Sequence, residues 1–430
     1  MDDTKLTVVE ETPQMAERRR RNVEVHAIRA KLEHPDGGMF TDEGGEVHFA
    51  KPPKRTPQNV ETVLRKDPRY LDGLSFDAFS GEVLWQGQPI TDADLTQIRL
   101  EIGRAYRLQV SLPLIHELVE YVARGREVHP VREYLKALRW DGTPRIDELL
   151  ARYAGADDAP IVRAIARRFM IAAVARIMAP GCKVDTVLIL AGIQGIGKST
   201  FFLTLPGEAW FRDDALDLRH KDAAMALKGV WLYELAELAS TRARDAETVK
   251  GFLSRRVDSF RPPYARKVVS QPRQSVFVGT TNEPAFLNDP TGARRFWPVE
   301  CKREPDLIAL QRDRDQLWAE AVEAFQAGER WHLERNEARA LEDHQERYRY
   351  EDPWLEPLRK WLATRTHEPH TTDELLTVAL AKDVDRLTKA DEMRIGPIMQ
   401  RLGWSKSRTT SGGRRVRCWV VSDPEEAENG

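Results

Sequence analysis

Short runs of apolar residues alternate along the middle of the chain with stretches whose apolar residues recur at three- and four-residue spacing. The run at residues 187–191 is apolar throughout, which is typical of a strand buried on both faces of a sheet. Similar runs at 230–233 and 276–279 end in polar residues. Residues 161–178 form a strongly apolar helical pattern, and a second helix is expected at 198–205. This order predicts an α/β core.

Helical spacing dominates the regions on either side of this core. N-terminal to it, helices are expected at residues 16–32, 60–66, 112–123 and 131–138, with strand or turn at 74–85. After the core strands, the pattern predicts helices at residues 247–256 and 306–328, then a charged connector at 334–352. Three helix-sized segments follow at residues 353–361, 372–380 and 393–402. Two strand-like runs within 405–421 complete the order helix, helix, helix and hairpin, which predicts a winged helix-turn-helix.

Composition limits where the protein acts and how it meets its partners. With 430 residues the chain is long for one core, and its formal net charge of -2 means that nucleic-acid binding would need local basic patches. The three cysteines, Cys182, Cys301 and Cys418, have neither metal-ligand nor disulfide spacing, which fits a reducing compartment. No signal peptide and no membrane span is visible. We therefore expect a cytoplasmic protein.

The loop after residues 187–191 reads Gly-Ile-Gln-Gly-Ile-Gly-Lys-Ser at 192–199, the spacing of a phosphate-binding P-loop. Glycines let backbone N–H groups turn toward an anion, and the helix that follows directs its N-terminal dipole to the same place. Lys198 is expected to reach the outer phosphates of ATP, and the Ser199 hydroxyl to bind Mg²⁺. The alternative is a glycine-rich turn that binds nothing. The residues expected at the ATP phosphates are Gly192, Gln194, Gly195, Ile196, Gly197, Lys198, Ser199 and Thr200.

Two glutamates follow the apolar run at 230–233, Glu234 directly and Glu237 three residues later. Nucleotide hydrolysis needs one acid near the metal and one that orients or deprotonates the attacking water. Glu234 is expected at Mg²⁺, although spacing alone leaves the division of roles open. The alternative is the rim of an amphipathic helix with two exposed acids.

Polar residues after the third apolar run complete a candidate catalytic set. Asn282 could hydrogen-bond the attacking water or the γ-phosphate, since an amide both donates and accepts. The adjacent Arg294 and Arg295 fit an arginine finger, a guanidinium that neutralises charge on the transferred phosphoryl group. Adjacent side chains point in different directions, so one could act on nucleotide and the other make a structural pair. We favour Arg295 as the finger.

Basic and aromatic residues between the second and third runs suggest a contact with single-stranded DNA, since cations attract phosphate and a ring stacks on a base. Two alternatives stay open, namely that some of these cations face nucleotide across a subunit boundary, or that the segment is a plain surface hairpin. The residues are Lys250, Arg261, Tyr264, Arg266 and Lys267.

The predicted winged helix carries a second basic group. Residues 394–422 contain no acid. Such a local cationic face is what binding to duplex DNA requires, and a protein-binding winged helix is the alternative. The basic residues are Arg394, Arg401, Lys406, Arg408, Arg414, Arg415 and Arg417.

Taken in order, the motifs resemble the virulence-associated protein E family, P-loop ATPases of phages and mobile genetic islands that are similar to superfamily three helicases in the AAA+ class. The matching segments are His-Pro-Val-Arg-Glu-Tyr-Leu at 129–135, Trp-Asp-Gly-Thr-Pro-Arg at 140–145, Pro-Gly-Cys-Lys at 180–183, the P-loop, Glu-Leu-Ala-Glu at 234–237, Val-Lys-Gly-Phe-Leu at 249–253, Arg-Pro-Pro-Tyr at 261–264, and Gly-Thr-Thr-Asn at 279–282 through Arg-Arg-Phe-Trp-Pro-Val at 294–299.

The resemblance implies an ATP-dependent helicase or replication initiator that works on DNA as a hexameric ring. It implies that Lys198 and Ser199 form the Walker A motif and Glu234 and Glu237 the Walker B motif. Asn282 would be sensor 1, and Arg294 or Arg295 the finger. No priming signature precedes the ATPase, which leaves open whether a separate primase is a partner.

The expected organisation has five parts. They are a polar, partly disordered segment at 1–57, a mostly helical domain at 58–155, an AAA+-like P-loop ATPase domain at 156–333, a winged-helix DNA-binding domain at 350–422 and an acidic tail at 423–430. The alternative function is a nucleotide-controlled DNA-binding switch in regulation or defence that does not separate strands. A small-molecule kinase is disfavoured, because it would have no use for a basic wing.

Overall fold

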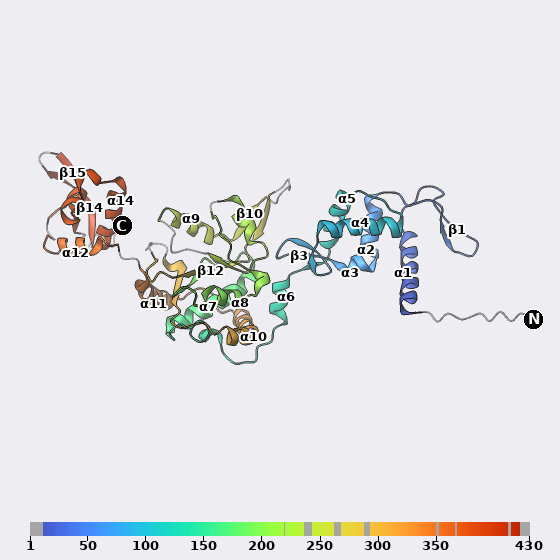
Figure 1. Ribbon diagram of the computed structural model, residues 1–430, viewed down its shortest axis with the longest axis horizontal. Helices are drawn as coiled ribbons and strands as arrows, with labels where there is room; N and C mark the ends of the chain where they lie inside the picture. The colour runs from blue at the N-terminus through green and yellow to red at the C-terminus, as the bar shows by residue number, and fades with distance from the viewer. Residues whose placement is uncertain are drawn as a thin grey trace, which may run out of the picture. The chain divides into compact units, whose positions relative to one another are not determined.

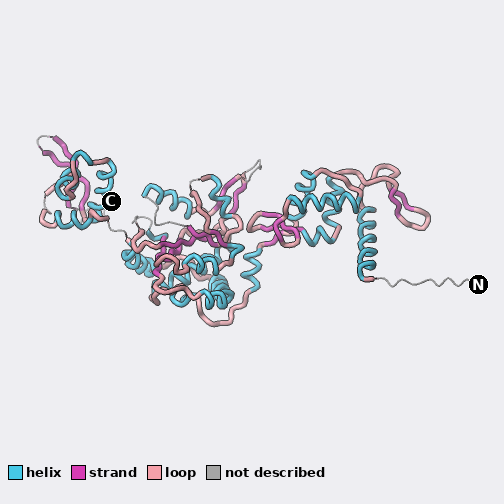
Figure 2. Tube along the Cα trace, viewed as in Figure 1, coloured by secondary structure: helices cyan, strands magenta, loops and turns pink. Residues whose placement is uncertain are grey.

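The structure is a computed structural model that describes residues 12–218, 220–235, 243–261, 268–287, 293–349, 352–365, 368–411 and 414–421. The chain forms two compact units. The larger comprises Met1–Glu283 and Thr291–His344, and the smaller comprises Pro284–Pro290 and Gln345–Gly430. Helices, strands and loops are distinguished in Figure 2.

The larger unit is built on a parallel sheet in the order β13-β7-β12-β9-β8. The strands are β7 (Val187–Ala191), β8 (Phe211–Arg212), β9 (Leu232–Leu235), β12 (Val276–Thr281) and β13 (Phe296–Glu300). β7, β9 and almost all of β12 are buried, as long apolar runs predict for a sheet covered on both faces. β7 lies between β12 and β13, so the loop at its carboxyl end is flanked by the ends of two other strands.

Helices cover both faces of this sheet (Figure 1). On one side lie α7 (Pro160–Met178), α8 (Lys198–Thr204) and α10 (Leu307–Gln326), and on the other lies α9 (Ala243–Leu253). Two fully buried tryptophans tie the first three helices to the sheet. Trp231 donates its indole N–H to the carbonyl of Ala173, Trp318 donates to that of Leu205, and the two rings lie 4.2 Å apart. The C-terminal end of α8 is therefore held in a close-packed core.

The remaining part of the larger unit has a hydrophobic cluster of its own, around Val63, Ile98 and Val119. Its four-stranded sheet has the order β5-β4-β3-β6. Its elements are α1 (Pro13–Arg29), β1 (Met39–Thr41), β2 (Val47–Phe49), α2 (Pro57–Lys66), α3 (Pro68–Gly73), β3 (Leu74–Asp77), β4 (Glu82–Trp85), β5 (Gln88–Pro89), α4 (Asp92–Tyr106), α5 (Leu112–Ala123), β6 (Glu127–Val128) and α6 (Pro130–Ala137).

The smaller unit contains helical segments followed by a hairpin. They are α12 (Leu355–Leu362), α13 (Thr372–Glu374), which continues as η8 (Leu375–Ala379), and α14 (Lys389–Arg401). β14 (Trp404–Ser411) and β15 (Arg414–Val421) pair antiparallel after them. Leu358, Leu375, Met399 and Trp419 are among the residues of their common core. Among the helices that the structure describes, none is long and apolar enough to cross a membrane.

Four sequence expectations about elements need correction. The predicted connector at 334–352 contains a helix, α11 (Arg335–Gln345). α4 was not predicted, although Thr91 starts it with a capping box. β13 was not predicted as a strand, because Pro298 lies inside it and Pro is unusual within a sheet. The strand expected at 230–233 is β9, so Glu234 lies inside the strand and not after it.

Candidate functional site

The glycine-rich loop connects β7 to α8 and is held in place by the two neighbouring strands. Gly192 donates its N–H to the carbonyl of Thr281 at 3.1 Å, and the carbonyl of Ala191 accepts from Cys301 at 2.7 Å. A Cβ at position 192 would lie 2.8 Å from the Cys301 carbonyl oxygen, so only glycine fits there without a shift. Gly195 and Gly197 have φ of +81° and +100°, which other residues rarely adopt.

Lys198 lies at the centre of this loop and is buried. Its Nζ donates to the carbonyls of Gly192 and Ile193, each at 2.8 Å, and to Oδ1 of Asn282 at 3.0 Å. Burial lowers the pKa of Lys198, because desolvation disfavours the ammonium form. The structure thus brings together Lys198 and Asn282, two of the predicted site residues.

Glu234 comes from the second strand away from the loop and is 3% exposed. Its Oε1 accepts from the Ser199 hydroxyl at 2.9 Å and from the Thr280 hydroxyl at 2.5 Å. Its Oε2 is buried and accepts no hydrogen bond from the residues that the structure describes. A buried carboxylate oxygen without a partner is costly, so this atom suits a cation or its water shell.

These residues fit the predicted magnesium site. A serine hydroxyl and a carboxylate offer the oxygen ligands that Mg²⁺ prefers, and both face the loop that carries Lys198. Thr280 was missed by sequence reasoning, although it lies in the Gly-Thr-Thr-Asn motif and its hydroxyl fixes the Glu234 carboxylate.

The other loop residues differ in exposure. Ile196 is buried, whereas Gln194, Gly195, Ser199 and Thr200 are exposed. The exposed positions remain available to a ligand. Glu237, the second predicted acid, lies outside the described residues.

The two arginines in η6 (Ala293–Arg295) have different surroundings. The Arg295 side chain is 15% exposed; its Nη2 donates to the Ser254 hydroxyl at 3.4 Å, and its Nε lies 3.6 Å from Asp185 Oδ2. Arg294 is exposed. Arg295 therefore has partners within its own chain, and which of the two arginines is the finger stays a prediction.

The basic segment between β9 and β12 forms a hairpin of β10 (Val257–Phe260) and β11 (Val269–Pro272). Arg261, which directly follows β10, is exposed, while Tyr264, Arg266 and Lys267 lie outside the described residues. Lys250 is buried, at 8% exposure, which weighs against its predicted contact with DNA. It lies on the covered side of α9.

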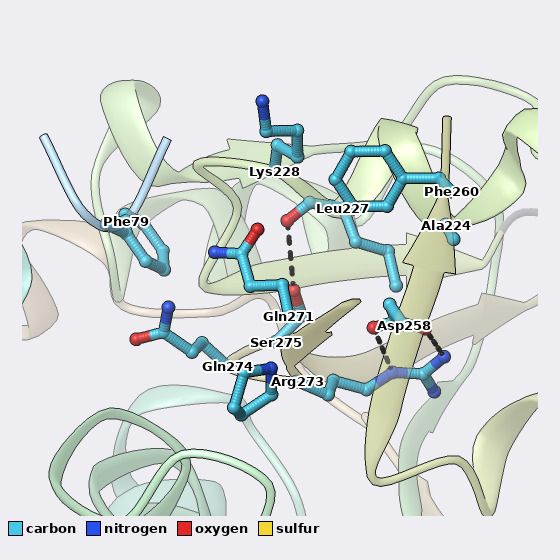
Figure 3. Close-up of a pocket in the computed structure, with 11 residues that line it drawn as sticks. Phe79, Ala224, Leu227, Lys228, Asp258, Phe260, Gln271, Arg273, Gln274 and Ser275 are labelled. Atoms are coloured by element: carbon cyan, nitrogen blue, oxygen red, sulfur yellow. Dashed lines mark hydrogen bonds and ion pairs between the residues drawn. The ribbon is translucent and has the colours of Figure 1, made fainter. Parts of the chain in front are cut away.

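The base of this hairpin is anchored by a buried ion pair (Figure 3). Arg273 donates from Nε and Nη2 to the two carboxylate oxygens of Asp258, at 2.8 and 2.5 Å, and from Nη1 to the Phe252 carbonyl at 2.6 Å. Lys228 and Phe79 line a cavity of about 20 Å³ beside it, about the size of one water. The hairpin is thus firmly held at its base.

The basic residues of the smaller unit also divide into two groups. Arg394 donates to both carboxylate oxygens of Asp352, at 2.7 and 2.8 Å, and lies over the Trp354 ring. This pair weighs against its predicted contact with DNA, because Asp352 neutralises the charge of Arg394. Arg401, Lys406, Arg408 and Arg417 are exposed. Arg414 and Arg415 belong to β15, and their side chains lie outside the described residues.

The fold and this site define a mixed α/β protein with a parallel sheet and a glycine-rich loop at the carboxyl end of β7. The chain belongs to the virulence-associated protein E-like family, whose domain model matches residues 135–350, half of the 430 residues. This confirms the family that the motifs indicated. No curated protein matches the chain.

The solved structures to which this chain is similar include those of the NrS-1 C-terminal region. The apo structure of residues 305–718 of that protein has 14% identity and a TM-score of 0.47, over 83% of this chain and 100% of that one. The A form apo structure of the region has 12% identity and a TM-score of 0.46, over 82% of this chain and 98% of that one.

Proposed function

We propose that this protein is an ATP-dependent DNA helicase or replication initiator of a phage or mobile genetic element, with an AAA+-like P-loop core. The observation that supports it best is the cluster of buried Lys198 and Glu234 with the Ser199 hydroxyl, in which Glu234 Oε2 is left without a hydrogen-bond donor among the described residues. A simple glycine-rich turn needs neither a buried lysine nor a buried carboxylate. The cluster suits a nucleotide triphosphate and its metal.

In the proposed site, the backbone N–H groups of residues 192–197 and the Lys198 ammonium bind the phosphates of ATP. Ser199 and Glu234 hold Mg²⁺, which when bound neutralises charge on the phosphate oxygens. Asn282, positioned by its hydrogen bond to Lys198, orients the attacking water. Glu237 remains the predicted partner of Glu234. Arg294 from a neighbouring copy would complete the site, which requires a head-to-tail ring.

The proposed partner is DNA. Three observations support this proposal. They are the family membership, the exposed Arg261 directly after β10 of the β10–β11 hairpin, and the exposed cations of the smaller unit. The smaller unit is interpreted as a winged helix, since its helices precede an antiparallel hairpin. A hexamer, a separate primase and a cytoplasmic location are part of the same proposal.

Lys198→Ala tests the ATPase. We expect Mg²⁺-dependent ATP hydrolysis to fall by about 10²-fold or more, because the cation that stabilises the transferred phosphoryl group is lost. Lys183→Ala, a change at a lysine whose side chain is 67% exposed, is the matched control and should leave turnover unchanged. Normal hydrolysis by Lys198→Ala would refute the site assignment.

Strand displacement separates the proposal from the alternative function. The proposed helicase should separate a forked duplex only with hydrolysable ATP. A DNA-binding switch in regulation or defence would bind the fork and hydrolyse ATP without separating the strands.

A further inference from the structure

The first turn of α14, the helix before the hairpin of the smaller unit, is acidic. Thr388 and Asp391 form its capping box, and Glu392 follows. In helix-turn-helix proteins the N-terminal residues of the second helix approach the DNA bases. Asp391 is paired with Lys382 at 2.6 Å, so the acid left to oppose the approach of phosphates at that end is the exposed Glu392. Arg394, one turn further on, is already paired with Asp352. α14 is therefore poorly suited to lead binding to DNA.

The hairpin presents the opposite charge. Lys406, Arg408 and Arg417 are exposed, and none forms an ion pair with another residue in the part of the chain that the structure describes. Arg408 lies directly opposite Arg417, and Lys406 opposite Trp419, so all three cations share one face of the hairpin. Like charges directly opposite each other destabilise a strand pair. An anionic ligand would offset that cost.

The aromatic residues of the hairpin indicate what kind of anion fits. Trp404 and Trp419 lie on the same face as the cations but are 4% and 2% exposed. Trp419 also donates its indole N–H to Thr372. Proteins that bind single strands stack bases on exposed rings. Within its described residues this hairpin exposes cations without rings, which suits the phosphate backbone of a duplex.

We propose that the β14–β15 hairpin, and not α14, leads the binding of this protein to duplex DNA, through phosphate contacts of Lys406, Arg408 and Arg417 that do not depend on sequence. This inference rests on the proposed function and names the surface that performs its DNA-binding part. The binding is therefore electrostatic and depends strongly on salt.

The test measures the affinity of the full-length protein for a labelled DNA duplex by fluorescence anisotropy over a range of salt concentrations. The hairpin variant carries Lys406→Gln, Arg408→Gln and Arg417→Gln. Each lost phosphate contact should reduce the steepness of log affinity against log salt by about 0.9, or roughly 2.7 for the three, equally for unrelated duplex sequences. The helix variant carries Lys389→Gln, Gln400→Ala and Arg401→Gln and should change the slope by less than half as much.

Three results would overturn the inference. The first is an unchanged salt slope in the hairpin variant, and the second is a larger reduction of the slope in the helix variant. The third is a loss of affinity for a single strand of the same length, in the hairpin variant, that equals its loss for the duplex. Lys406 lies 5.2 Å from the Trp419 ring centre, so the triple variant could lose stability. The double variant Arg408→Gln, Arg417→Gln leaves that contact intact and should reduce the slope by about 1.8.

Failure of this inference about the hairpin can be distinguished from failure of the proposed function. ATP hydrolysis without DNA should be the same in the hairpin variant and the unmodified protein, since the substitutions lie outside the nucleotide site. If Lys198→Ala had no effect on hydrolysis, the ATPase proposal would fail while the salt slopes would still decide which surface binds DNA.

Discussion

Glu234 has two carboxylate oxygens with different surroundings. Oε1 accepts two hydroxyl hydrogen bonds, from Ser199 and Thr280, whereas Oε2 is buried without a donor among the described residues. The sequence placed Glu234 at the end of an apolar run and predicted it at Mg²⁺. It could not show the contact with Thr280, because that residue is 46 positions away along the chain. The structure therefore shows how each carboxylate oxygen of Glu234 is surrounded, which residue spacing alone could not show.

Glu234→Gln should separate binding from hydrolysis. The amide oxygen can still accept from Ser199, but the negative charge is lost. We expect ATP hydrolysis to fall by about 10²-fold or more, while nucleotide affinity changes far less. Single-turnover hydrolysis and fluorescent nucleotide titration measure the two effects. Glu300→Gln, an exposed acid at the end of β13, is the control. Full hydrolysis in Glu234→Gln would contradict the assigned role.

At the scale of elements, the position of the β10–β11 hairpin depends on contacts that its local sequence pattern does not predict. The pattern predicted a stiff turn, with a plain surface hairpin as one alternative. The structure adds the buried pair of Asp258 and Arg273, which connects the hairpin to the end of α9 through the Phe252 carbonyl. A buried charge is tolerated only when it is paired and hydrogen-bonded, so this pair fixes the base of the hairpin.

Asp258→Asn should destabilise the protein, because it leaves the buried Arg273 guanidinium without a counter-charge. Breaking one partner of a buried pair costs about 3–5 kcal/mol. Chemical denaturation measures the free energy of unfolding. Asp158→Asn removes the acid of an exposed pair with Arg163 and should change stability little. Equal effects of the two substitutions would show that burial does not control the strength of these pairs.

His129 connects α6 to the core through a neutral imidazole. Its Nδ1 accepts the Arg132 N–H that caps α6, and its Nε2 lies 2.6 Å from Gln274 Oε1 and donates to it. Burial lowers the pKa of His129 below its usual value, because desolvation disfavours the imidazolium. The unfolded chain therefore binds a proton first, and stability is lost as the pH falls below about 6.5.

His129→Asn should remove this part of the acid sensitivity. Asparagine can still accept the capping hydrogen bond but does not titrate. The free energy of unfolding, measured from pH 7 downwards, should fall less steeply in the variant than in the unmodified protein. Parallel pH profiles would exclude His129 as the titrating group.

At the scale of the whole molecule, the proposed finger belongs to a neighbouring copy. Arg294 is exposed and forms no hydrogen bond with Lys198, Ser199 or Glu234 of its own chain within the described residues. A site completed between copies makes hydrolysis depend on assembly. The rate of ATP hydrolysis should then rise more steeply than in direct proportion to the protein concentration.

Mixing two inactive variants tests this arrangement. Lys198→Ala lacks the phosphate-binding cation and Arg294→Ala lacks the proposed finger, so each alone should be inactive. In a mixed ring, some interfaces pair an intact Lys198 with an intact Arg294, and about a quarter of the activity should return for random pairing in equal mixtures. No recovery, or full activity of Arg294→Ala alone, would contradict a finger supplied by the neighbour.

The sequence by itself determined the family and the features set by local spacing. The apolar runs predicted three core strands, and the glycines with Lys198 and Ser199 predicted the loop, because backbone geometry and strand burial depend on residues close together in the chain. Only the tertiary structure decided which distant side chains meet. Glu234 lies 35 residues from Ser199, and Asn282 lies 84 residues from Lys198. The pairing of Arg295, the neutralisation of Arg394 and the burial of Lys250 likewise depend on packing between elements, which no local pattern records.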